Sequence, residues 1–431
     1  MLLRNATLAS FDPPSVELGD LRIVGSRIAE RGHGLALHAD EDLIDLDGAL
    51  VFPGLVNAHT HLYSALARGM PGPVPPPRAF VDVLKGVWWR LDRALDEESV
   101  RWSALVGGIE AALSGTTLLV DHHSSPGWIR GSLDTIAGAL EEVGLRCVLC
   151  YEVTDRNGPA GRDAGIAENE AFLAGAASES RRGLLGAHAS FTLSEETLAG
   201  IAAALRRRAS GLHIHVAEDW ADVLDCQEKH GEDVPARLRR HGLLGPTTLF
   251  AHCVHLTPEQ LTAAQADGVW VAHNPRSNMN NDVGYAATDA LQHAALGTDG
   301  MDGDMLAEAR AAFLQMREAG RVDAYRAALD LLAGGHRLAA ALFGLPFGAL
   351  TAGAPADLVL ARYDPPTPLH SGNLAGHLLF GLDRSHVSSV IVAGRFVVRD
   401  RKLLTLDSRA TFERSRPAAA ALWQRMERLP A

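Results

Sequence analysis

The middle of the chain alternates short apolar segments with longer segments of helical spacing, and this alternation limits the fold more than any other feature. Strands that alternate with helices form parallel sheets, and eight such units close into a (β/α)8 barrel. We therefore predict an α/β fold whose main unit is a TIM-like (β/α)8 barrel. Its strands are expected to end in HTH (59–61), TTLLVDHH (116–123), RCVLCYE (146–152), RGLLGAHAS (182–190), LHIHVAE (212–218), TTLFAHC (247–253), VWVAHNP (269–275) and AALGTDG (294–300).

The two ends of the chain have a different texture, in which short alternating segments are separated by glycine, proline and aspartate. Examples are LRIVGSRIAERG and GALVFPG near the start, and GAPADLVLARYD and VSSVIVAGRFVVRD near the end. This pattern is typical of strands joined by turns. We predict that residues 1–54 and 348–410 combine into one small β domain, that 55–347 form the barrel, and that 411–431 form a C-terminal helix.

The charge balance argues against a nucleic-acid partner. The 431 residues include 40 Lys and Arg against 52 Asp and Glu, a formal net charge of −12, whereas nucleic-acid binding needs patches of positive charge. No segment reaches the roughly 18 uninterrupted apolar residues of a membrane span, and the N-terminus lacks a signal-peptide pattern. We expect a cytoplasmic protein with a small-molecule partner and no membrane or nucleic-acid partner, and leave a homo-oligomer open.

Cysteine usage gives no sign of disulfides. Four cysteines are too few and too scattered for a disulfide framework in a chain of this length. Cys147 and Cys150 lie within the apolar segment CVLC, for which a buried strand is favoured over a redox pair.

Two histidines one residue apart, His59 and His61, end the first predicted strand. Side chains two positions apart on a strand point to the same side, so both imidazoles can face one ion. This pair alone is a weak signal, because two strand histidines with ordinary hydrogen-bond partners are more common. The signal strengthens because His215 and Asp299 lie at the ends of the fifth and eighth strands, which a closed barrel brings to one mouth. Three histidines and a carboxylate predict a zinc or ferrous-iron site.

A second metal is not expected. The end of the fourth predicted strand has no lysine, and a carbamylated lysine there would be needed to bridge two ions. We therefore predict one divalent ion per chain, with Zn²⁺ as the first candidate and Fe²⁺ as the alternative.

The order of five motifs resembles that of the amidohydrolase superfamily, specifically its mononuclear deaminase and chlorohydrolase branch. The motifs are PGLVNAHTH, LHIHVAE, FAHCVHL, NPRSNM and LGTDG, and the similarity covers nearly the whole chain. More narrowly, WWRLDRALDEES, DHHSSP, RSNMNNDVGY and LGTDGMDGDM resemble the SsnA-type aminohydrolases. The resemblance implies a distorted (β/α)8 barrel, a composite β-sandwich domain formed by the two terminal segments, and a catalytic divalent metal.

The resemblance also implies roles for single residues. The family's metal ligands match His59, His61, His215 and Asp299. Glu218 matches its proton-shuttling glutamate, and His252 matches the histidine that hydrogen-bonds the attacking water or the tetrahedral intermediate. The chemistry agrees, because a divalent metal lowers the pKa of bound water toward about 7. Asp299 can then accept the water proton while Glu218 delivers a proton to a ring nitrogen.

Other histidines near the predicted rim have both a functional and a structural interpretation. His188 ends the fourth strand, where relatives use a histidine to contact substrate, and we predict the same role here. His122 and His123 are adjacent, so only one can face the barrel lumen; the choice stays open, and His123 is our candidate substrate contact. His213, two residues before His215, is predicted to be a core histidine with satisfied hydrogen bonds.

Two loops carry further candidates. Arg276 and Asn278 follow the seventh strand, where bracing of the loop is at least as well supported as contact with substrate. Trp88 and Trp89 lie in the long insertion after the first strand. They can cover a flat ring, although packing beneath the loop is favoured.

Together these features predict a metal-dependent hydrolase of carbon–nitrogen bonds other than peptide bonds. The favoured reaction is hydrolytic deamination of an amino-substituted nitrogen heterocycle, such as a purine. Dechlorination, or cleavage of an N-alkyl or cyclic amide bond, is the alternative at the same site. A non-catalytic assembly protein of the superfamily is disfavoured, because such relatives typically lack the metal ligands and all four positions are filled here.

Overall fold

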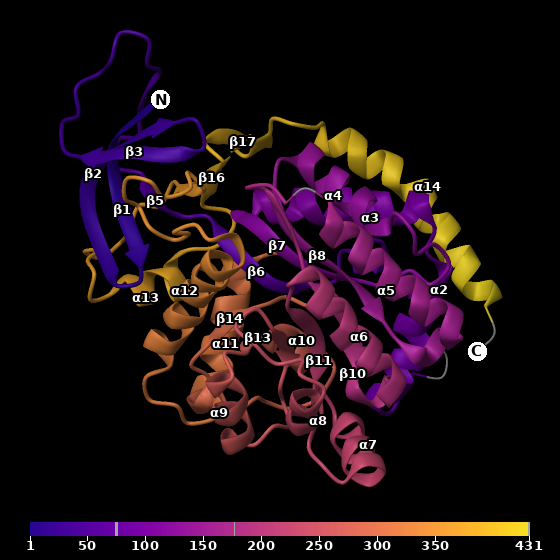
Figure 1. The fold of residues 1–431 in the computed structure, drawn as a ribbon. Coiled ribbons are helices and arrows are strands. Elements are labelled where there is room, and N and C mark those ends of the chain that lie inside the picture. Colours follow the sequence, from indigo (N-terminus) through magenta and orange to yellow (C-terminus); the bar gives the residue numbers. More distant parts are fainter. Residues whose placement is uncertain (74–75, 176, 430–431) are drawn as a thin grey trace.

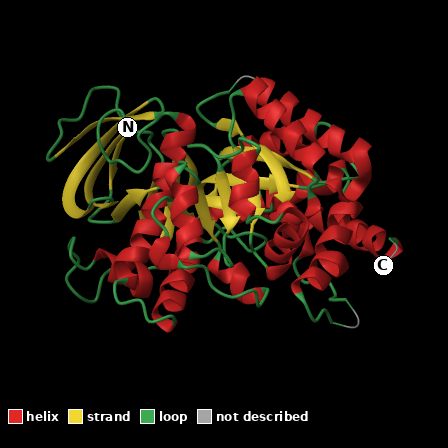
Figure 2. Ribbon diagram, turned by 60° about the horizontal axis from the view of Figure 1, so that its bottom comes forward, coloured by secondary structure: helices red, strands yellow, loops and turns green. Residues whose placement is uncertain are grey.

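Two β-sheets organise the molecule in the computed structural model, which describes residues 1–73, 76–175 and 177–429. A parallel sheet lies at the centre of the larger unit and is surrounded by helices, and a second sheet lies to one side of it (Figures 1 and 2). Among the described residues, no helix is long and apolar enough to cross a membrane.

The central sheet contains the eight parallel strands that the sequence predicts, in the predicted order. Almost every residue of these strands is buried, as expected where helices cover a parallel sheet. A bridge between Thr60 and Asp299 links the first strand to the segment after the last, so the barrel is nearly closed. The strands are β6 (Leu55–Thr60), β7 (Thr116–His123), β8 (Arg146–Val153), β10 (Leu185–Ala189), β11 (Leu212–Val216), β12 (Leu249–His252), β13 (Trp270–His273) and β14 (Ala294–Leu296).

Helices cover the outside of the barrel, and local sequence signals set their ends. In α3, for example, Asp96 and Ser99 form a capping box at the N-terminus, which satisfies backbone groups that would otherwise lack partners. The short strand β9 (Arg181–Gly183) pairs with β8 beside the barrel. The covering helices are α3 (Glu97–Leu113), α4 (Ser132–Val143), α5 (Gly158–Ala174), α6 (Glu195–Arg208), α7 (Trp220–His230), α8 (Val234–Arg240), α9 (Pro258–Ala266), α10 (Pro275–Asn280), α11 (Met305–Glu318) and α12 (Ala324–Phe343).

The second sheet joins the two ends of the chain, as predicted. Its nine strands form a sandwich-like domain, in which β5 from the N-terminal segment pairs antiparallel with β15 from the C-terminal segment. The short helical turns α13 (Leu374–Gly376) and η6 (His377–Gly381) lie between β15 and β16. The strands are β1 (Leu2–Phe11), β2 (Pro14–Val24), β3 (Arg27–Gly32), β4 (Leu43–Asp45), β5 (Leu50–Pro53), β15 (Leu358–Ala361), β16 (Val387–Val392), β17 (Arg395–Arg399) and β18 (Lys402–Leu403).

The C-terminal helix α14 (Ser408–Arg428) lies along the outside of the barrel, beside α2 (Trp89–Ala94) and α3 (Figure 1). Trp423 Nε1 donates to the carbonyl of Leu66 (2.8 Å), and Arg425 Nε donates to the carbonyl of Ala94 (2.8 Å). The helix thereby holds both ends of the insertion that follows β6. The helix begins at Ser408, one turn before its predicted start at residue 411. The predicted domain boundaries stay predictions.

A buried ion pair fastens the barrel to the second sheet. Arg146, at the start of β8, is fully buried and makes two contacts with the carboxylate of Asp357, from Nε (2.6 Å) and Nη2 (3.0 Å). Asp357 lies just before β15, and its Oδ1 also accepts from the amide of Ala393 (2.8 Å). The sequence analysis did not identify this pair.

Removing one partner of this pair leaves a buried, unpaired charge. We expect Asp357→Ala to lower the free energy of unfolding by about 3–5 kcal/mol. Asp330→Ala, which breaks an exposed pair with Arg326, is the control and should change it by less than about 1 kcal/mol. Urea unfolding followed by tryptophan fluorescence measures both, and equal losses would show that the buried pair does not fasten the two units.

Candidate metal centre and active site

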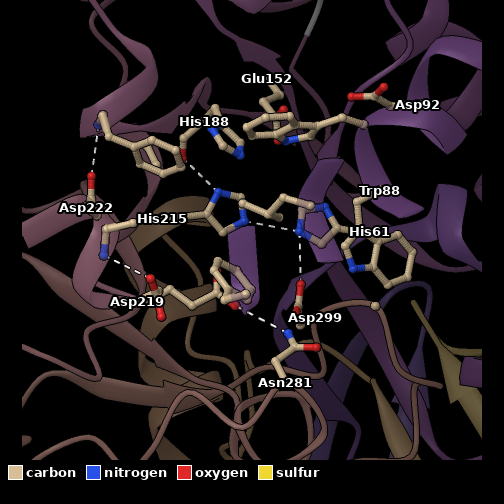
Figure 3. Close-up of a pocket in the computed structure, with 18 of the residues that line it drawn as sticks. His61, Trp88, Asp92, Glu152, His188, His215, Asp219, Asp222, Asn281 and Asp299 are labelled. Atoms are coloured by element: carbon tan, nitrogen blue, oxygen red, sulfur yellow. Dashed lines mark hydrogen bonds and ion pairs between the residues drawn. The ribbon is translucent and has the colours of Figure 1, made fainter. Parts of the chain in front are cut away.

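A pocket of about 740 Å³ opens at the carboxyl ends of the barrel strands. His61 and His215 meet at its centre, with Asp299 beside His61 (Figure 3). One wall is apolar and comes from the insertion after β6, which contains η1 (Leu62–Ala67), α1 (Phe80–Val83), the π-helical turn η2 (Leu84–Trp88) and α2.

The four predicted metal ligands converge. His61 Nε2 lies 3.1 Å from His215 Nε2 and 3.0 Å from Asp299 Oδ1. His59 Nε2 lies 3.5 Å from the same carboxylate oxygen. The three segments that carry these side chains, β6, β11 and the turn after β14, are brought together only because the barrel closes.

Hydrogen bonds to backbone carbonyls set the tautomers of two of these histidines. His61 Nδ1 donates to the carbonyl of His122 (2.6 Å), and His215 Nδ1 donates to the carbonyl of His188 (2.8 Å). A carbonyl can only accept, so Nδ1 carries a proton in each ring, and Nε2 is the nitrogen that can bind an ion.

The donor set fits a divalent ion. His59 Nε2 is buried and has no hydrogen-bond partner among the described residues, although it points at Asp299. Ligand atoms of His59, His215, His252 and Asp299 all lie within 4.8 Å of one another. Three imidazole nitrogens and a carboxylate oxygen are a ligand set that zinc or ferrous iron accepts.

Asp299 is held by its backbone as well as by its neighbours. Its φ of 53° is left-handed, an uncommon conformation for a residue other than glycine, and its amide donates to the carbonyl of His59 (2.9 Å). Ser277 donates a hydrogen bond to the other carboxylate oxygen. Burial raises the pKa of Asp299, but the imidazoles of His59 and His61 beside its carboxylate outweigh burial and hold the pKa well below its usual value.

Glu218 lies beside the ligands, where its surroundings favour the protonated carboxyl group. Burial raises its pKa well above the usual value, and the negative charge of Asp299 raises it further. Asn281 Nδ2 lies 3.5 Å from Glu218 Oε1, and Asp222 braces the loop by accepting from the amide of Ala217 (2.9 Å). A carboxyl group that stays protonated near neutral pH can act as a general acid.

His252 faces both Glu218 and the ligand cluster. Its Nε2 lies 3.6 Å from Glu218 Oε2, and its Nδ1 lies 2.8 Å from Asn278 Oδ1. Burial lowers the pKa of His252, which keeps the ring neutral. The φ of 73° at His252 and 56° at Cys253 turn the chain sharply where β12 ends. Asn278 therefore contacts the predicted catalytic histidine, and we assign it to bracing that residue.

Of the predicted substrate contacts, the structure brings His188 to the pocket but not His123. His188 lines the pocket, holds Thr192 Oγ1 at 2.7 Å and meets the edge of Trp89. His123 lies outside the pocket lining, against Tyr63 and Tyr151, with Nε2 2.8 Å from Ser125 Oγ.

The reason is the alternation of side chains along β7. His122 packs edge-on against His213 and His215 inside the barrel, so the next residue points the other way. The expectation that His123 contacts substrate therefore has no support in this geometry.

The structure also places the candidate residues of the two loops. Trp88 and Trp89 both line the pocket, so they can cover a ring bound there. Arg276 pairs with Asp302 (2.7 Å) and Glu308 and braces the loop outside this pocket.

Several charged residues at the pocket were missed in the sequence analysis, and three of them form a network. Glu152 and Asp92 line the pocket, and Arg156 joins them through Nη2 to Glu152 Oε1 (2.5 Å) and Nη1 to Asp92 Oδ2 (3.3 Å). The Arg156 guanidinium also lies over the ring of Trp89, 4.6 Å from its centre. Burial raises the pKa of Asp92 to about 7. Glu152 could have been found from its place near the end of the third barrel strand, but Asp92 had no such signal.

Comparison with known proteins agrees with this geometry. Residues 50–397 match the model of the amidohydrolase family. A 5-methylthioadenosine/S-adenosylhomocysteine deaminase of Desulforudis audaxviator is 32% identical over 98% of this chain and 99% of its own. A 5'-deoxyadenosine deaminase of Methanothermobacter thermautotrophicus is 31% identical over 96% of both chains.

Solved structures share the fold. An adenosine deaminase from Xanthomonas campestris with bound zinc superposes with a TM-score of 0.84, at 22% identity over 99% of this chain and 98% of that one. The zinc complex of atrazine chlorohydrolase TrzN from Arthrobacter aurescens gives a TM-score of 0.83, at 23% identity over 98% and 99%. The predicted barrel and the resemblance to the superfamily are confirmed, whereas the narrower likeness to SsnA-type aminohydrolases stays a prediction. The chain belongs to the amidohydrolase family.

Proposed function

We propose that the protein catalyses metal-dependent hydrolytic deamination of an amino-substituted nitrogen heterocycle, with adenine nucleosides and related purines as the first substrates to test. The observation that carries this proposal is the convergence of His59, His61, His215 and Asp299 beside Glu218, a carboxyl group whose pKa is raised. The names of the relatives, which are deaminases of adenosine derivatives, support it.

The ligand set would hold one divalent ion, zinc being the first candidate. A divalent ion bound by His59, His61, His215 and Asp299 supplies Lewis-acid activation of water. Asp299, which its low pKa keeps ionised, would accept the proton of the attacking water. Glu218 donates its proton to the ring nitrogen next to the carbon under attack.

Attack converts that carbon to a tetrahedral centre that carries a hydroxyl group and an amino group. Proton transfers then decide which of the two groups leaves. The neutral His252, 3.6 Å from Glu218, is placed to hydrogen-bond the new oxygen. The proton taken up by Asp299 passes to the amino group, which leaves as ammonia, and the hydroxyl proton returns to Glu218, so that a carbonyl remains on the ring. The overall change is one water consumed and one ammonia released.

The pocket lining indicates a flat substrate that is neutral or cationic. The aromatic side chains of Phe80, Trp88 and Trp89 offer a large apolar surface to a ring. Carboxyl groups dominate the polar part of the lining, and none of the described lysines or arginines lines it. Phosphate groups would be repelled there, so nucleosides and free bases are favoured over nucleotides.

Dechlorination is the second candidate, because a zinc-containing chlorohydrolase shares the fold. Cleavage of an N-alkyl or cyclic amide bond would use the same machinery. Incubation with adenosine, adenosine monophosphate and chlorinated or aminated triazines, with ammonia and chloride measured in parallel, separates these reactions. Ammonia from adenosine but not from its monophosphate is the expected result, and chloride release alone would favour the second candidate.

We predict about one zinc or iron per chain in the purified protein, because one oxygen, Asp299 Oδ1, lies within 3.5 Å of both His59 Nε2 and His61 Nε2. His61→Ala and His215→Ala should each reduce this content strongly, while His293→Ala, a change at a histidine outside the site, is the control. Elemental analysis of the dialysed proteins measures it. Two tightly bound ions per wild-type chain would refute the mononuclear site.

Glu218→Gln should keep the metal and the fold but lower kcat by about 10²–10⁴-fold, because the amide cannot donate the same proton. The raised pKa of Glu218 also predicts the direction of the pH dependence. Because only the protonated form donates, wild-type activity should fall as pH rises through that pKa. Steady-state kinetics across pH test this, with the exposed Glu228→Gln on α7 as control. Near-normal kcat in Glu218→Gln would remove Glu218 from the proton relay.

His188→Ala should raise KM or lower kcat/KM on the best substrate of the panel without loss of metal. The reason is that His188 lines the pocket through its ring, whereas it contacts the metal ligand His215 through its backbone carbonyl. Metal content and kinetics are measured on the same preparation. Lost metal would make His188 part of the metal centre, and unchanged kinetics would leave it a purely structural role.

A further inference from the structure

We propose that His213 and Cys150 are positioning residues for the metal ligand His59, which they hold through a buried chain of hydrogen bonds. This series of hydrogen bonds crosses the barrel interior from β6 to β11 and then to β8. It ends at the backbone of β7. This inference rests on the proposed metal centre and concerns how one ligand is oriented within it.

The first link is a contact between two imidazoles. His59 Nδ1 lies 2.9 Å from His213 Nε2. His59 Nε2 faces Asp299 and the other ligands, so it must be free of hydrogen to bind an ion. The hydrogen of a neutral His59 is therefore on Nδ1. It follows that His59 Nδ1 donates and His213 Nε2 accepts.

The second and third links follow from the first. Because His213 accepts at Nε2, its hydrogen is on Nδ1, which lies 3.6 Å from Cys150 Sγ. The thiol in turn lies 3.6 Å from the carbonyl of Asp121, to which it can only donate. Burial raises the pKa of Cys150 well above its usual value, which keeps the thiol protonated for this bond. Each hydrogen bond in this series then has one defined donor and one defined acceptor.

This arrangement distinguishes His59 from the other two histidine ligands. His61 and His215 donate directly to backbone carbonyls, which no side-chain substitution removes. His59 has a side chain as its Nδ1 partner, and the two supporting side chains are both buried. The orientation of His59 thus depends on the identities of residues 213 and 150. His213 was predicted to be a core histidine, and its hydrogen bonds are satisfied, but one of them is to a metal ligand.

The test measures zinc affinity by competition with a chromogenic chelator, and the visible spectrum of the Co²⁺-substituted protein. His213→Leu should lower zinc affinity by about 10–100-fold and change the Co²⁺ spectrum, as expected for loss of a partner that orients a ligand. His213→Gln can still accept from His59 and should lose less. Circular dichroism and the Tm establish that each variant is folded.

A matched pair of cysteines provides the control. Cys150→Ala should weaken zinc binding, whereas Cys147→Ala should not, since Cys147 lies on the same strand, is equally buried and has no contact with His213 among the described residues. Because Cys150 acts through His213, the double variant His213→Leu/Cys150→Ala should bind zinc no more weakly than His213→Leu.

Folded His213→Leu protein with wild-type zinc affinity and Co²⁺ spectrum would overturn the proposal, while the proposed function would stand on the wild-type metal content. If neither variant at 213 folds, the cysteine pair decides: equal affinities of Cys150→Ala and Cys147→Ala would equally overturn it. Failure of the wild-type protein to bind zinc would instead contradict the proposed function itself.

Discussion

The closeness of three imidazole rings and one carboxylate is the constraint on which the rest of the structure depends. His61 Nε2 and His215 Nε2 lie 3.1 Å apart, and their rings are fixed because each Nδ1 donates to a backbone carbonyl. These carbonyls belong to His122 and His188, at the ends of the neighbouring barrel strands. The orientation of the ligands is thus a direct product of strand register. Asp299 completes the set at the point where the barrel closes on β6.

The barrel and the insertion after β6 contribute different residues to the site. Strand ends supply the metal ligands, Glu218 and His252, which carry the proposed chemistry. The insertion supplies Trp88, Trp89 and Asp92, which line the pocket beside the ligands. The C-terminal helix α14 ties down both ends of this insertion through Trp423 and Arg425. A helix far from the reacting groups therefore supports the wall that a substrate ring would touch.

Sequence patterns predicted those features of the fold and the site that depend on local periodicity. The eight strands were recognised from short apolar segments, and the metal ligands from their places at the ends of those segments. His123 was assigned to the substrate because the sequence does not reveal which of two adjacent residues points inward; the register of β7 decides that. The Arg146–Asp357 and Arg156–Asp92 pairs join residues far apart in sequence, so no spacing marks them. His213 was correctly placed in the core, but its contact with His59 needed the geometry.

The most direct test of the metal centre is X-ray absorption at the zinc edge of the zinc-loaded protein. Three histidine nitrogens and a carboxylate oxygen predict a first shell of nitrogen and oxygen scatterers at about 2.0–2.2 Å, with the outer-shell pattern of about three imidazoles. A sulfur scatterer at about 2.3 Å, or a pattern with a single imidazole, would contradict a site built from His59, His61, His215 and Asp299.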